Sequence, residues 1–345
     1  MNWNEYGSFI VEETKNLLAI DSPSGMTKKA AEHVMTRFEA LGYAPQMTRK
    51  DGVLVCLGGV DKENGLLLEA HMDTLGGMVC QIKANGRLKI TPIGGLRAEN
   101  VETENCRVVT KFDGVIEGTA QLINASTHVN EKYADTQRTF DTIEIVLDEP
   151  VESADDVKKL GIRTGDYVCF EPRTRVTKSG YIKSRFLDDK LSVGILLGYA
   201  RYLKDERITP ERAVYVHITS FEEVGHGGSA SVPAGVTEAI SVDMGCVGEG
   251  LTCDERMVSI CAKDSGGPYN YDVVRGLIAA AEKMGAPYAV DIYPRYGSDV
   301  EATLRAGYDL RHGLIGSGVY ASHGYERSHI EGALATLKTL AGYVK

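Results

Sequence analysis

The sequence lacks several features that would mark other classes of protein. None of its seven cysteines forms a Cys-x-x-Cys pair, which argues against a structural zinc knuckle or a disulfide framework and fits reduced thiols. No apolar run approaches the roughly 20 residues of a membrane span. The first residues also lack the basic and apolar segments of a signal peptide. We therefore expect a cytoplasmic, soluble protein that does not engage a membrane.

The chain also lacks a basic patch, and its formal net charge is −10. Without clustered Lys and Arg to neutralise phosphates, a nucleic-acid partner is not expected. A hydrophobic content of 43% with 25% charged residues is typical of a globular protein. A length of 345 residues favours one large domain with a smaller one.

The two ends of the chain differ from its middle in the secondary structure that their sequence predicts. Apolar spacing predicts helices at 28–41, 190–202, 271–283 and 330–343, and strands at 53–57, 66–69, 213–221, 239–244 and 257–262. A turn is expected at Asn64-Gly65. Between them lie short strand-like segments at 78–82, 88–92, 107–111, 142–147 and 166–171, with one helix near 153–160. We predict an α/β fold, a mixed sheet flanked by helices, formed by residues 1–74 and 176–345. Residues 75–175 would form an inserted small all-β, barrel-like domain.

Acidic or imidazole side chains follow several of these strands or open a helix. His71 follows the strand 66–69, and Asp73 two residues later points the same way in extended chain, so that it could support the His71 ring. Asp188 and Asp189 open a helix, and the pair Glu222-Glu223 ends the apolar strand 213–221. Further ligand candidates are Asp243 and His323. Open α/β sheets place their sites at such strand ends.

These residue types suit a pair of divalent metal ions. Two co-catalytic ions about 3.5–4 Å apart need a bridging carboxylate, terminal ligands and a water between them. A neighbouring carboxylate can take the proton of that water and pass it to a leaving amine. Zn²⁺, Co²⁺ and Mn²⁺ accept mixed imidazole and carboxylate ligands.

The order of the motifs resembles one family. His-Met-Asp at 71–73, Leu-Asp-Asp at 187–189, Glu-Glu-Val-Gly at 222–225, Val-Asp-Met-Gly at 242–245 and a C-terminal His are similar to the dinuclear metallo-aminopeptidases of the glutamyl and tetrahedral (deblocking) family. The resemblance implies that Asp188 bridges two divalent metal ions per subunit, and we expect Zn or Co, with Mn as the alternative. His71 and Asp243 would be terminal ligands, with Glu223 and His323 completing the shells. Glu222 would be the general base and acid, and Asp73 would orient His71. It also implies a homo-oligomer, from dimer to dodecamer, formed through the inserted domain and acting on short peptides.

Three assignments stay open in the sequence. The C-terminal ligand is placed at His323, which follows the apolar run 314–321, with His329 as the alternative. The Gly297-Ser298-Asp299 turn resembles a segment that lines the family's substrate pocket, so Asp299 is expected to bind substrate. A histidine of the inserted domain approaches the site in related peptidases, so a role for His128 is considered beside an ordinary surface position.

Other functions fit the same ligands. A deacylase or carboxypeptidase of the related dinuclear amidohydrolases is the main alternative, but those enzymes insert their accessory domain after the Glu-Glu pair, whereas here the long gap lies before Asp188. A non-catalytic metal-binding or peptide-binding protein would not need the spare carboxylate of Glu222. A glucanase activity, a label given to some relatives, has little support. The sequence therefore favours an aminopeptidase, and it leaves the preferred N-terminal residue open.

Overall fold

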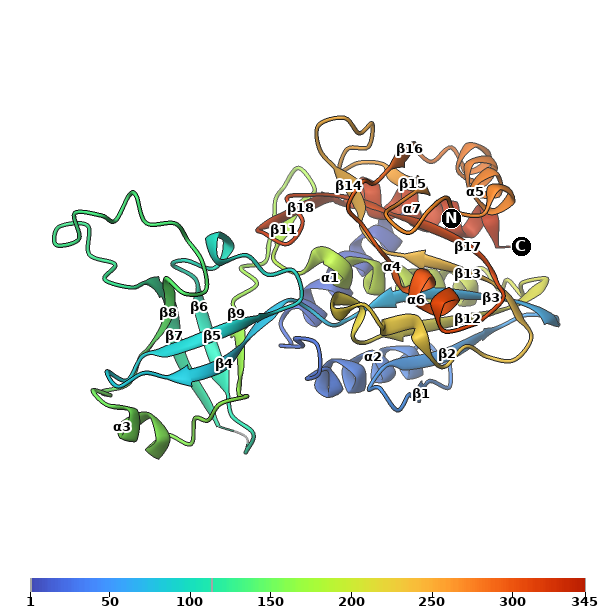
Figure 1. Ribbon diagram of the computed structural model, residues 1–345. Helices are drawn as coiled ribbons and strands as arrows, with labels where there is room; N and C mark the ends of the chain where they lie inside the picture. The colour runs from blue at the N-terminus through green and yellow to red at the C-terminus, as the bar shows by residue number, and fades with distance from the viewer. Residues whose placement is uncertain (1, 113, 345) are drawn as a thin grey trace. The chain divides into compact units, whose positions relative to one another are not determined.

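The computed structural model describes residues 2–112 and 114–344, which form two compact units (Figure 1). One unit is Met1–Thr74 with Arg173–Lys345, and the other is Leu75–Pro172. The boundaries expected from the sequence were 74/75 and 175/176. The second lies three residues earlier in the structure, because β10 (Arg175–Val176) pairs with β11 (Tyr181–Ser184) in the sheet of the larger unit.

The larger unit is built on a twelve-stranded mixed sheet. Its main path runs β1-β2-β12-β3-β13-β17-β18-β11-β10, while β14 and β15 pair with β17 and β16 pairs with β15. At its centre β12, β3, β13 and β17 run parallel to one another. The remaining strands are β1 (Gln46–Met47), β2 (Val53–Gly58), β3 (Asp61–His71), β12 (Arg212–Thr219), β13 (Val236–Val242), β14 (Gly245–Val247), β15 (Val258–Lys263), β16 (Tyr288–Ile292), β17 (Arg311–Tyr320) and β18 (Glu326–His329). The turn expected at Asn64-Gly65 is wrong, because β3 continues through it with an irregular register.

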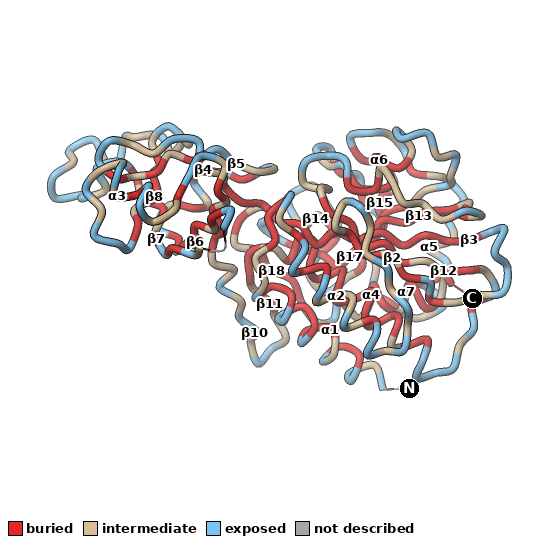
Figure 2. Tube along the Cα trace, turned by 90° about the horizontal axis from the view of Figure 1, so that it is seen from below, coloured by how far each residue is buried: buried red, intermediate tan, exposed pale blue. Residues whose placement is uncertain are grey.

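Helices cover both faces of this sheet. Alternate side chains of β3 divide between two cores: Leu66 and Leu68 pack with the large helices, and Leu67 packs with Val300 of α6 on the other face. The helices are α1 (Trp3–Leu18), α2 (Lys28–Ala40), α4 (Leu187–Asp205), α5 (Tyr271–Met284), α6 (Asp299–Arg305) and α7 (Ile330–Tyr343). The contact between α1 and α4 is close, because a Cβ on Gly194 would clash with Thr14. Figure 2 shows the central strands as the most continuously buried part of this unit.

The smaller unit is a closed antiparallel barrel with the order β4-β5-β8-β7-β6-β9. Its elements are β4 (Gly76–Ile82), β5 (Leu88–Ile93), β6 (Asn105–Val109), β7 (Val115–Leu122), β8 (Ile143–Leu147), α3 (Ala154–Lys159) and β9 (Tyr167–Phe170). The sequence pattern does not predict β7, because its buried positions include the small residues Gly118 and Ala120 and therefore give a weak apolar alternation. The predicted fold class, a mixed sheet flanked by helices with an inserted barrel-like β domain, is confirmed. Among the described residues, no helix is both long and apolar enough to span a bilayer.

Candidate active site

The carboxyl ends of the central parallel strands bring the predicted site residues together. His71 is the last residue of β3, and Asp243 directly follows β13. β12 ends at Thr219, shortly before a 3₁₀ turn, Glu222–Val224, that carries the Glu pair. The turn lies between two left-handed residues, Phe221 (φ 71°) and Gly225 (φ 85°). Asp188 and Asp189 lie at the start of α4 with non-helical backbone angles, and the peptide bond between them is cis.

The carboxylate of Asp188 lies between two histidines. Its Oδ1 is 3.1 Å from Nε2 of His71, and its Oδ2 is 3.5 Å from Nε2 of His323. Each of the two glutamates lies near one of these histidines. Oε2 of Glu222 lies 3.7 Å from Nε2 of His71, and Oε2 of Glu223 lies 3.6 Å from Nε2 of His323. One carboxylate thus faces both imidazoles through different oxygen atoms.

The two C-terminal histidines have different surroundings. His323 reaches Asp188 and Glu223, as described above. In contrast, Nε2 of His329 lies 2.7 Å from the carbonyl oxygen of Ser179, and its Nδ1 accepts a hydrogen bond from the main-chain N–H of Glu331. His329 therefore caps α7, while His323 belongs to the carboxylate cluster.

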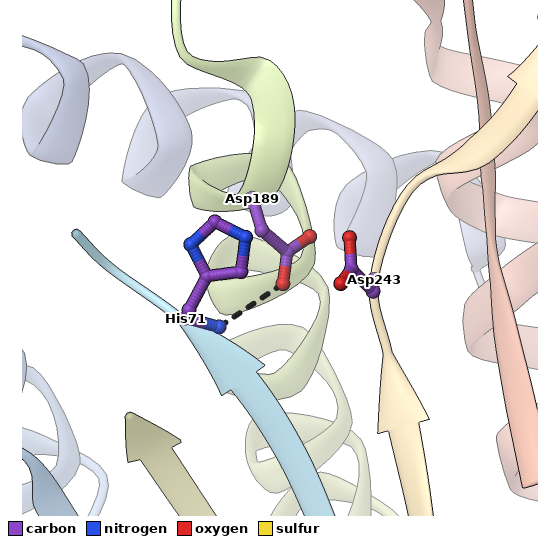
Figure 3. Close-up of side chains that lie close together, drawn as sticks. All are labelled: His71, Asp189 and Asp243. Carbon is purple, nitrogen blue, oxygen red and sulfur yellow. Dashed lines mark hydrogen bonds between the residues drawn. The ribbon is translucent and has the colours of Figure 1, made fainter. Parts of the chain in front are cut away.

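Asp189 is a member of the cluster to which sequence analysis gave no role as a ligand. Figure 3 shows its carboxylate between His71 and Asp243, at the start of α4. Its Oδ2 accepts a hydrogen bond of 3.1 Å from the main-chain N–H of His71, and Oδ1 is buried without a hydrogen-bond partner. One group of potential ligand atoms, within 4.8 Å of one another, comes from His71, Asp189 and Asp243, and a second comes from His71, Asp188 and Glu223. Residue type and position alone do not separate the roles of two adjacent aspartates, and only the family resemblance assigned the bridge to Asp188.

The electrostatics of the cluster favour bound cations. Burial raises the pKa values of Asp189, Glu222 and Glu223, and it raises the pKa of Asp243 to about 7. Although burial opposes it, hydrogen bonds from His323 and His71 lower the pKa of Asp188. So many buried carboxylates are stable in ionised form only beside compensating positive charge, which paired side chains or metal ions supply. The mixed imidazole and carboxylate donors fit Zn²⁺ or a similar divalent ion.

Asp73 supports the cluster through its main chain as well as its carboxylate. Its carbonyl oxygen is 3.0 Å from Nδ1 of His71, whereas its Oδ1 is 3.7 Å away. We expected the Asp73 carboxylate to contact the His71 ring, but the main-chain oxygen of Asp73 lies closer to it. The carboxylate instead accepts hydrogen bonds from the N–H groups of Glu222 and Glu223, at 3.2 and 3.4 Å, and from the hydroxyl of Ser24. Asp73 thus links His71 to the turn that carries both glutamates.

Asp299 is buried at the start of α6, against the loop that follows the Glu pair. Its Oδ1 accepts a hydrogen bond of 2.6 Å from the N–H of Gly228, and its Oδ2 accepts one from the hydroxyl of Thr219. A Cβ on Gly227 would clash with the Asp299 carboxylate. Nζ of Lys50 donates to two carbonyl oxygens of the same loop, those of His226 and Gly227. Both oxygens of Asp299 are therefore engaged by the protein, and its expected role in substrate binding stays a prediction.

Two further histidines of the larger unit, His217 and His226, are not members of the cluster. His217 is buried within β12, with Nδ1 3.4 Å from Oε1 of Glu69, and it is a core histidine. The ring of His226 stacks on Phe221, in the loop after the glutamates. His128 is exposed in the barrel unit, and its proposed approach to a site stays a prediction.

The chain is similar in sequence to known aminopeptidases. Residues 51–339 match the family model described as M42 glutamyl aminopeptidase. YhfE of Bacillus subtilis (strain 168), whose name marks it as a candidate aminopeptidase, is 41% identical over 335 residues, which cover 97% of each chain. The glutamyl aminopeptidase of Lactococcus lactis subsp. cremoris (strain MG1363) is 25% identical over 226 residues, 64% of this chain and 61% of that protein.

Solved structures share the fold at low sequence identity. Aminopeptidase APDkam598 of the archaeon Desulfurococcus kamchatkensis has a TM-score of 0.87 at 22% identity, covering 98% of this chain and 95% of that one. The TET1 peptidase of Pyrococcus horikoshii, described as assembling into a tetrahedron or a large octahedral shell, has a TM-score of 0.84 at 21% identity, with 97% and 99% covered. Both likenesses span the α/β unit and the barrel.

Proposed function

Because this chain belongs to the M42 glutamyl aminopeptidase family, we propose that it removes N-terminal residues from short peptides with the help of two divalent metal ions. As a member of that family the protein is an aminopeptidase, a hydrolase that acts on peptide bonds. The observation that carries the two-ion proposal is the carboxylate of Asp188, whose two oxygens face His71 and His323 separately.

The chain supplies a ligand set for each ion. His71 and Asp243 would hold one ion and Glu223 with His323 the other, with Asp188 bridging them. Asp189 accepts a hydrogen bond from the main-chain N–H of His71 and would therefore hold the His71 main chain in place. Its carboxylate would also be available as a further metal ligand. When bound, Zn²⁺, Co²⁺ or Mn²⁺ would supply Lewis acidity, polarising the scissile carbonyl and making water more acidic.

Glu222 is the proposed general base and acid. Its side chain is 17% exposed, against 5% for Glu223, so it is the more accessible carboxylate of the pair. Burial already raises its pKa, which suits a group that must accept a proton and then release it. An oxygen of Glu222 would take the proton of the attacking water and deliver it to the nitrogen of the leaving peptide. Asp73 holds the Glu222 N–H and so fixes the turn from which this side chain projects.

The assembly and location of the protein are proposed by analogy. Solved TET1 structures are described as a dodecamer and as a tetrahedron or a large octahedral shell, which favours a homo-oligomer for this chain. We expect this homo-oligomer to form through the barrel unit. The cytoplasmic location stays a prediction. Short peptides are the proposed partners, since aminopeptidase is the activity of the family.

Replacement of Glu222 by Gln tests the function. Glu222→Gln should release amines from a panel of aminoacyl anilides about 10²- to 10⁴-fold more slowly than the native protein, with Zn²⁺, Co²⁺ or Mn²⁺ supplied in turn. The variant should still bind metal, because Glu222 is not among the proposed ligands. The matched control is Glu206→Gln, at an exposed position beyond α4, which should be as active as the native chain. A native protein that is inactive with every metal, or a fully active Glu222→Gln, would refute the proposal.

A further inference from the structure

Glu326, the first residue of β18, is a buried carboxylate that contacts two proposed ligand residues at once. Its Oε1 accepts a hydrogen bond of 3.0 Å from the main-chain N–H of His323, and its Oε2 accepts one of 3.1 Å from the main-chain N–H of Asp188. Only 2% of its surface is exposed. No pattern in the sequence points to this residue.

The sheet explains how one side chain reaches both segments. β18 pairs with β11, in which Ser184 lies opposite Glu326, and with β17, in which Tyr320 lies opposite Arg327. β11 leads into the start of α4 at Asp188, and β17 leads into the turn that holds His323. The first residue of β18 therefore lies between the two chain segments that carry these ligands.

Asp188 and His323 are connected both through Glu326 and directly through their own side chains. Glu326 joins the main chains of Asp188 and His323, while the side chains of the same two residues approach each other to 3.5 Å. His323 has a left-handed backbone (φ 62°), a conformation that is costly for residues other than glycine. A hydrogen bond from its N–H helps to hold that conformation.

We propose that Glu326 is a positioning residue that fixes Asp188 and His323 at the separation needed to bind one metal ion. A carboxylate is required, because an amide in its place offers one acceptor oxygen and turns a donor NH₂ group toward the second N–H. Removing one of the two contacts would free either the bridging carboxylate or the imidazole. This inference rests on the proposed function, and it adds a residue that does not itself contact the ion.

The experiment counts ions bound to metal-free full-length protein titrated with Co²⁺, by calorimetry and by the visible absorption of the ion. The native chain should bind two Co²⁺ ions. In Glu326→Gln, one of the two affinities should fall about 10- to 100-fold and the other should change less. The matched control is Glu238→Gln on β13, which is equally buried but paired with Arg212 and Arg311 away from the cluster, and it should keep both affinities.

The double variant shows whether Glu326 acts through His323. Glu326→Gln should have much less effect in a His323→Ala background than in the native chain. If Glu326→Gln does not fold, Glu326→Asp replaces it, because the shorter side chain cannot reach both N–H groups and should show the same selective loss. Two ions bound with native affinity by the folded variants would overturn the inference and leave the proposed function intact. If the native chain binds no Co²⁺, both the inference and the proposed function are refuted.

Discussion

Nε2 of His323 lies 3.5 Å from Oδ2 of Asp188, while His71 approaches the other oxygen of the same carboxylate. His71 and His323, each more than 100 positions from Asp188 in the chain, thus both contact its side chain. This relationship selects His323 over His329 as the proposed C-terminal ligand. It also makes Asp188 the one carboxylate of the cluster that contacts both imidazoles.

The two C-terminal histidines should respond differently to truncation. His323→Ala removes a proposed ligand, so kcat/KM should fall by about 100-fold or more at limiting metal, beyond the usual effect of losing an outer contact. His329→Ala removes a helix cap, so it should lower the free energy of unfolding by about 1–2 kcal/mol and leave kcat/KM near its native value at saturating metal. Anilide hydrolysis and urea unfolding of both variants measure these effects. The reverse pattern would assign the ligand to His329.

The role of Asp299 can be decided by kinetics. Both of its oxygens bind groups of the protein next to the Glu222 loop, so Asp299→Ala should lower kcat and the stability of the fold, by about 2 kcal/mol, with little change in KM. Asp299→Asn keeps an acceptor for Gly228 and a donor for the Thr219 hydroxyl and should recover most of the loss. If KM rises while kcat stays at its native value, Asp299 contacts the substrate, as the sequence suggested.

The buried His217 predicts how stability depends on pH. Burial lowers its pKa from 6.5 to about 4, with a raising effect from Asp299 and a lowering effect from Lys50, and its ring also faces Glu69. Below pH 6.5 the unfolded chain therefore binds a proton that the folded chain does not. The free energy of unfolding should fall by about 3 kcal/mol from this group between pH 6.5 and pH 4.

Urea unfolding of metal-free protein across this pH range tests the effect, with His217→Gln as the comparison. Since glutamine does not titrate, the variant should lose less stability on acidification. Parallel curves for the two proteins would show that His217 is not the source of the dependence.

The sequence predicted the fold class and most of the cluster, because both depend on local patterns in a fixed order. Apolar strands that end in His71, the Glu222-Glu223 pair or Asp243 are visible without a structure, and parallel strands bring such ends together. Membership of the M42 family also decides against the deacylase alternative. The choice of His323 depended on the apolar run before it, which is the strand β17.

The residues that were missed depend on contacts between distant segments. Glu326 acquires its position because β18 lies between β11 and β17, and no spacing along the chain shows that pairing. Asp189 could not be separated from Asp188 by type or position. The carboxylate of Asp73 was expected at the His71 ring, but the turn brings the main-chain oxygen closer and leaves the carboxylate for Glu222 and Glu223. Tertiary hydrogen bonding, not residue type, sets these contacts.

The central claim is that two ions share the carboxylate of Asp188, and anomalous diffraction from crystals grown with Zn²⁺ tests it most directly. We predict two peaks per chain, about 3.5–4 Å apart, one near each oxygen of Asp188. One should lie next to His71 and Asp243, and the other next to Glu223 and His323. A single peak, or a pair of peaks bridged by Asp189, would contradict this account.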